Sequence, residues 1–75
     1  MWTHVKPTYD LVEQWIARKG GLSVCSLRRD QDGWAASLLN FGGISTTQMH
    51  LTSKLSLEQA QAECDKELKR MGYVE

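Results

Sequence analysis

The chain has 75 residues, nine basic and nine acidic side chains, and a formal net charge of zero. A chain of this length forms a single domain (1–75) with little room for a buried active site beside its core, so an enzyme is not expected. The neutral total lacks the strong positive field of proteins that hold nucleic acid through many phosphates, although a local basic patch is compatible with it.

Residues 1–7 are expected to form an N-terminal arm. The arm has no apolar signal region, and no window approaches the roughly 20 apolar residues of a membrane span, so we expect a cytoplasmic protein with no membrane partner. Cys25 and Cys64 lack any companion pair, which favours reduced thiols; one disulfide between them is the alternative.

The stretch "TYDLVEQWIARKGG" predicts a helix over 8–19. Thr8 suits the N-cap, and Gly20 supplies a left-handed stop after the last turn. The apolar residues of the stretch recur at i, i+1, i+4 and i+5, as on one stripe of a short helix. These residues are Leu11, Val12, Trp15 and Ile16.

Three strand-like runs, "LSVCSLRR", "WAASLLNF" and "ISTTQMHL", predict a three-stranded antiparallel meander over 22–51. The linking "DQDG" and "GG" segments are hairpin signals. A primed turn at Gly42 and Gly43 pairs opposite residues that share one face of the sheet. The predicted pairs are Leu39 with Thr46, Ser37 with Gln48, and Ala35 with His50.

One face of this meander is nearly continuously apolar. Its predicted members are Cys25, Leu27, Trp34, Ala36, Leu38, Thr47, Met49 and Leu51. The opposite face is predicted to be polar, with Ser26, Arg28, Ser37, Thr46, Gln48 and His50. A three-residue turn in place of the Gly-Gly turn would swap the faces of the third strand.

The segment "SLEQAQAEC" predicts a second helix over 56–71. Ser56 and Gln59 form an S-x-x-Q capping box, and Gly72 suits the residue after the helix, with Tyr73 folding back onto Leu68. The predicted buried stripe is Leu57, Ala60, Cys64, Leu68 and Met71. The expected fold class is therefore α+β: a single small domain in the order helix-strand-strand-strand-helix, with both helices packed on one face of the sheet.

Around the Gly-Gly turn, the otherwise polar face is expected to carry an apolar patch of Leu22, Val24, Leu39, Phe41 and Ile44. A patch of this kind on so small a domain marks a contact surface. Arg28 and Arg29 would orient a partner there. Two alternatives stay open: the arm covers the patch through Trp2 and Val5, or the patch is a homodimer interface.

Neither catalysis nor a metal site is predicted. His4 and His50 are the only histidines, and with the two cysteines they show no local ligand spacing. A thiol with no placed base beside it is only a small hydrophobe. No cofactor is expected.

The predicted order of elements over 8–72 resembles the double-stranded-RNA-binding domain. That family's binding implies a histidine in the first hairpin loop and lysines at the start of the second helix. This chain has "DQDG" and "SLEQAQAE" at those places. The resemblance therefore implies the fold and not RNA binding.

In size, neutral charge, its "DGW" strand start and its "SLEQAQAEC" helix, the chain also resembles short orphan proteins of bacteriophages and prophages, including anti-CRISPR proteins. That resemblance implies a phage or mobile-element inhibitor that binds and blocks a bacterial host protein complex, such as a CRISPR-Cas effector. The alternative is a nucleic-acid-binding or antitoxin-like module. It requires five basic residues to converge in space: Arg18, Lys19, Arg28, Arg29 and Lys54.

Overall fold

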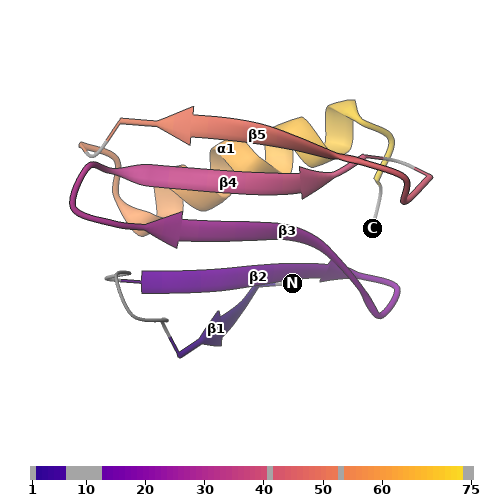
Figure 1. Ribbon diagram of the computed structural model, residues 1–75, viewed down its shortest axis with the longest axis horizontal. Coiled ribbons are helices and arrows are strands. Elements are labelled where there is room, and N and C mark those ends of the chain that lie inside the picture. The colour runs from indigo at the N-terminus through magenta and orange to yellow at the C-terminus, as the bar shows by residue number, and fades with distance from the viewer. Residues whose placement is uncertain (1, 7–12, 41, 53, 74–75) are drawn as a thin grey trace.

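The computed structural model of the protein describes residues 2–6, 13–40, 42–52 and 54–73. Five strands lie side by side in chain order in one antiparallel sheet, and a single helix lies on one face of it (Figure 1). The elements are β1 (Trp2–Val5), β2 (Glu13–Lys19), β3 (Leu22–Arg29), β4 (Trp34–Leu39), β5 (Thr46–Leu51) and α1 (Leu57–Arg70). The expected order of helix, three strands and helix is therefore wrong.

The main correction concerns the segment read as the first helix. Its described part is strand β2, which pairs with β3 along its whole length. Gly20 and Gly21 have φ of +59° and +82°, so they form the two-residue hairpin turn that joins Lys19 to Leu22, and not a helix stop. Residues 8–12, with Thr8, Leu11 and Val12, lie outside the described residues.

The N-terminal arm adds β1 to the sheet as an edge strand. Trp2 pairs with Ala17 of β2 and lies on the same face as α1, where its indole Nε1 donates a 3.2 Å hydrogen bond to Asp65 Oδ2. The arm therefore extends the sheet and does not fold over its other face.

The predicted meander corresponds to β3, β4 and β5. Leu39 pairs with Thr46, and the pairs Ser37–Gln48 and Ala35–His50 follow in the same register, as predicted. The turn itself is wider than expected, since the amide of Asn40 donates to the carbonyl of Ser45 and that of Gly43 to the carbonyl of Asn40. The loop between Leu39 and Thr46 still contains an even number of residues, so the side chains of β5 lie on the predicted faces of the sheet.

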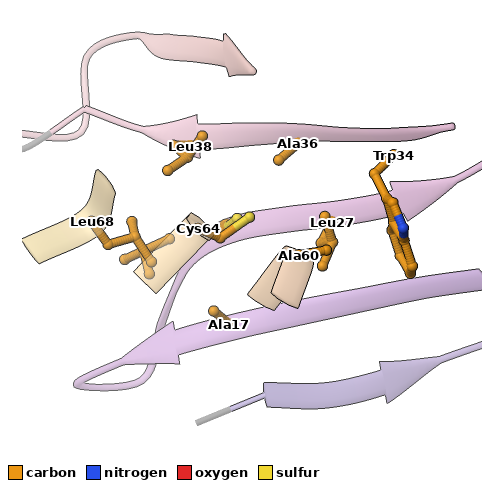
Figure 2. Close-up of a cluster of buried hydrophobic side chains, with 10 residues drawn as sticks. Ala17, Leu27, Trp34, Ala36, Leu38, Ala60, Cys64 and Leu68 are labelled. Carbon is orange, nitrogen blue, oxygen red and sulfur yellow. The ribbon is translucent and has the colours of Figure 1, made fainter. Parts of the chain in front are cut away.

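The core lies between α1 and the face of the sheet that it covers, over β3 and β4. Figure 2 shows Leu27 and Ala36 of the sheet with Ala60, Cys64 and Leu68 of the helix in one cluster. The apolar face predicted for β3 and β4 is buried here, which confirms that assignment: Cys25, Leu27, Trp34, Ala36 and Leu38. Met49 and Leu51 of β5 pack at its margin.

Helix α1 begins and ends as predicted. Ser56 and Gln59 form both hydrogen bonds of the capping box. At the other end, the amide of Tyr73 donates to the carbonyl of Leu68 and that of Gly72 to the carbonyl of Lys69, the two bonds of a Schellman motif. Within the described residues, no helix combines the length and the apolar character needed to cross a membrane.

Candidate functional site

The candidate site is the face of the sheet that α1 leaves uncovered, called the open face below. Each strand contributes every second residue to it, because side chains alternate along a strand and opposite residues share a face. Its members are Thr3, Val5, Gln14, Ile16, Arg18, Ser23, Ser26, Arg28, Ala35, Ser37, Leu39, Thr46, Gln48 and His50.

Among the strand residues that the structure describes, the open face carries positive charge and no negative charge. Arg18 and Arg28 lie on it, and none of the strand residues that form it is acidic. The acidic residues that the structure describes lie elsewhere: Glu13 on the other face of β2, Asp30 and Asp32 in the β3–β4 turn, and Glu58, Glu63, Asp65 and Glu67 on α1. Helix α1 also carries three basic residues, Lys66, Lys69 and Arg70, so its own charge is nearly balanced, whereas the two arginines of the open face have no acidic strand residue beside them on that face.

Arg28 lies in the middle strand of the sheet and is held by two hydroxyl groups and by the carbonyl oxygen of Ser26, to which its Nη1 donates at 3.4 Å. Its Nη1 donates to Ser26 Oγ at 3.1 Å, and its Nη2 donates to Ser37 Oγ at 3.2 Å. Ser37 in turn donates to Gln48 Oε1 at 2.9 Å. Among the described residues, Arg28 has no acidic partner. These bonds fix the guanidinium against the sheet while its full charge stays available to a ligand.

A shallow apolar depression of about 190 Å³ adjoins this network on the open face. Its apolar lining comes from Ile16 of β2, Val24 of β3 and Leu39 of β4. The rest of the lining is Cys25 together with Ser23, Ser26, Ser37 and Thr46. The alternation of β3, β4 and β5 predicted the polar members of this site. Ile16 was missed, because its segment was read as a helix and the residue was assigned to the helix stripe.

A β-bulge moves one of the predicted patch residues to the core. Ala17 pairs with Cys25 and Arg18 pairs with Ser23, so Val24 is an extra residue in β3. At a bulge, two successive side chains can point to the same side, and both Val24 and Cys25 are buried in the core cluster, Val24 at 1% exposure. Val24 is among the residues that line the depression, but at 1% exposure it offers a partner almost no surface.

Three other predicted patch residues lie at the end of the sheet that holds the β2–β3 and β4–β5 turns. Leu39 lies on the open face, and Leu22 and Ile44 are exposed near the turns at 51% and 95%. Phe41 lies outside the described residues. Arg29 projects on the same side as α1, where its guanidinium carbon stands 5.5 Å from the ring centre of Trp34.

The five basic residues required for nucleic-acid binding do not share one face. Arg18 and Arg28 lie on the open face, whereas Arg29 lies over Trp34 on the opposite side. Lys54 belongs to the segment between β5 and α1. This arrangement gives no continuous basic track for a phosphate backbone.

The histidines and cysteines are also placed apart from one another or buried. The ring of His4 packs against Trp15 at 4.8 Å on the helix side, whereas His50 lies on the open face. Cys25 and Cys64 are free and buried. A hydrogen bond with Cys25, together with burial, raises the pKa of Cys64. In the described parts of the chain, no group of three or more potential ligands could hold a metal ion.

Comparison with protein-family models, with curated proteins and with solved structures finds no match.

Proposed function

We propose that the protein is a non-enzymatic binding module that acts by occupying a surface of another protein, with the open face as its docking surface. The observation that carries the proposal is Arg28, a guanidinium fixed in the middle of an uncovered sheet by Ser26 and Ser37, with no acidic partner among the described residues. A cation held in this way has already lost much of its side-chain freedom, so a ligand would have less ordering to impose on it.

The chemistry of the open face favours a partner surface with an acidic residue beside an apolar one. A carboxylate would accept a charge-assisted hydrogen bond from N–H groups of Arg28 that its bonds to Ser26 and Ser37 leave unused. The apolar neighbour would enter the depression between Ile16 and Leu39. An arginine next to an apolar hollow is the composition that dominates the binding energy of many protein interfaces.

Within this class, we propose an inhibitor encoded by a phage or mobile element that blocks a bacterial host complex such as a CRISPR-Cas effector. The resemblance to short phage proteins supports it, as does a domain in which α1 covers one face of the sheet and leaves the other for a partner. Such an inhibitor needs no chemistry of its own, because a bound domain excludes the host complex from its normal partner.

The test is affinity capture from bacterial lysate with four versions of the protein: the parent, Arg28→Ala, Arg28→Glu and Arg70→Ala. Arg70 is the matched control, because it is an exposed arginine on α1 paired with Glu67 at 2.6 Å. We expect the same partner to be captured by the parent and by the Arg70 variant, less of it by Arg28→Ala, and none by Arg28→Glu. Capture that is equal for all four versions, or absent for the parent, would reject the proposal.

A further inference from the structure

We propose that β5 is a self-association edge through which two copies of the chain form one continuous ten-stranded sheet. The edge shares Thr46, Gln48 and His50 with the open face, but it associates through backbone groups in the plane of the sheet, so the open face stays uncovered in such a dimer. The inference rests on the hydrogen-bonding groups of β5, on its lack of charge and on a groove beside it.

The outer edge of β5 presents backbone groups that β4 does not use. The amide of Asn40 donates to the carbonyl of Ser45, so this pair is a hydrogen-bonded pair of the antiparallel ladder. Because such pairs alternate along the ladder, the N–H and C=O groups of Thr46, Gln48 and His50 point away from β4. β5 is the last strand of the sheet, and its outward groups form a template for another strand.

Two copies of β5 satisfy these groups in one antiparallel register. With Gln48 opposite Gln48 of the second copy, Thr46 lies opposite His50 of that copy, and every outward N–H and C=O of the three residues finds a partner. A shift to either neighbouring symmetric register pairs one of these residues with a position beyond the strand. In the register with Gln48 opposite Gln48, the two-fold axis of the dimer passes beside this residue.

Charge favours a second copy over a foreign strand as the occupant. All six residues of β5 are described and none is formally charged, whereas natural edge strands that avoid association carry charges, especially lysine, or proline. The chain as a whole has zero net charge, so two copies do not repel each other. Because β5 carries no formal charge, its side chains do not favour a foreign strand of opposite charge over a second copy.

The neighbourhood of β5 also leaves room for a second strand on the helix side. A groove of about 410 Å³ lies between β5 and the end of α1, with Met49 and Thr47 on one wall and Met71, Glu67 and Arg70 on the other. In the proposed register, Met49 lies opposite Thr47 of the second copy in a pair whose side chains are close together. The dimer would therefore bring apolar atoms of both copies to a groove that one chain leaves open.

The test introduces a charge at the two-fold axis. Gln48 is exposed, so Gln48→Lys and Gln48→Glu each place a charge directly opposite its own copy without disturbing the core. The matched control is Thr3→Lys on β1, the other edge of the sheet. Molar mass is measured by light scattering from about 1 μM to about 1 mM, a range that covers the weak and moderate affinities of small interfaces.

We expect the parent and Thr3→Lys to approach twice the mass of one chain, with each Gln48 variant needing at least roughly tenfold higher concentration to do so. An equimolar mixture of Gln48→Lys and Gln48→Glu should restore the dimer, because opposite charges then meet at the axis. A parent that stays monomeric, a dimer unaffected at Gln48, or a mixture that fails to associate would overturn the proposal.

Amide hydrogen exchange of the parent supplies a second measurement that needs no variant. The amides of Thr46, Gln48 and His50 should become protected as the concentration rises, whereas those of Thr47 and Met49, which bond to β4, should be protected throughout. Protection that does not depend on concentration would also overturn the proposal.

Discussion

The indole Nε1 of Trp34 donates a 3.0 Å hydrogen bond to the carbonyl oxygen of Leu55, which joins the start of β4 to the segment that leads into α1. Trp34 is 2% exposed, and the bond itself is partly buried. Trp34→Phe removes the donor, leaves the carbonyl unpaired and opens a small void. We expect the free energy of unfolding to fall by about 2 kcal/mol, measured by urea denaturation with far-UV circular dichroism.

The matched control for this prediction is Trp15→Phe. Trp15 is half-buried, and its Nε1 donates to the side chain of Glu13, which water can replace. The loss there should be below about 1 kcal/mol. Equal losses for the two variants would show that the bond to Leu55 does not anchor the helix.

Because of the β-bulge in β3, we expect alanine substitutions at Val24 and Leu22, which the sequence placed in one surface patch, to differ in their effect on the free energy of unfolding. Val24→Ala should lower the free energy of unfolding by about 2 kcal/mol, since Val24 is buried in the core. Leu22→Ala should change it by less than about 0.5 kcal/mol, because Leu22 is 51% exposed. The same denaturation measurement checks both, and a larger loss at Leu22 than at Val24 would contradict the bulge.

The start of α1 depends on a cap that can be removed without touching the core. The Oγ of Ser56 accepts a hydrogen bond from the amide of Gln59 at 3.2 Å, and the Gln59 side chain accepts one from the amide of Ser56. Ser56→Ala should cost about 1 kcal/mol in unfolding free energy. Ser56→Asp, which keeps an acceptor at the N-cap, is the control and should restore most of it; a loss as large as that of alanine would contradict the capping role.

Local signals in the sequence predicted the second half of the chain well. The box at Ser56 and Gln59 and the glycine after the helix each satisfy groups within a few residues, so their partners can be identified without the fold. The register of β4 and β5 followed from the glycines at 42 and 43 and from the alternation of apolar residues. These features are short in range and independent of what packs elsewhere.

The fold of the first half of the chain was predicted wrongly because glycine after an apolar stripe occurs both at helix ends and in hairpin turns. A glycine after an apolar stripe is a helix stop, but two consecutive glycines with positive φ, as at Gly20 and Gly21, also make a hairpin turn. Trp15 and Ile16 fit either interpretation, since they occupy adjacent positions on a helix stripe and opposite faces of a strand. Pairing of β2 with both β1 and β3 decided between them, and neither pairing can be seen in the pattern of the segment itself.

No feature of the local sequence indicated the bulge at Val24. The run "LSVCSLRR" alternates cleanly, and that pattern placed Val24 on the open face. The extra residue becomes visible only when β3 is paired with β2, because it is the mismatch between two strands that turns Val24 inward. The open face therefore kept Arg28, Ser26 and Ser37, as alternation predicted, but lost one apolar member of the predicted patch.

We expect the protein to lose stability at alkaline pH because of the buried Cys64 thiol. A hydrogen bond with Cys25, and then burial, raise the pKa of Cys64 above its ordinary value of 9.0, so the folded protein holds this proton more tightly than the unfolded chain does. The contribution of this thiol to the free energy of unfolding is fully present below pH 9.0. It is lost as the pH rises further, because the thiol of the unfolded chain then ionises. The free energy of unfolding should fall by up to about 1.4 kcal/mol per pH unit on this account. Urea denaturation between pH 7 and pH 10.5 measures it, and Cys64→Ala, which has no thiol to ionise, should show a shallower fall. Identical slopes for the parent and the variant would show that the buried thiol does not govern the alkaline limb.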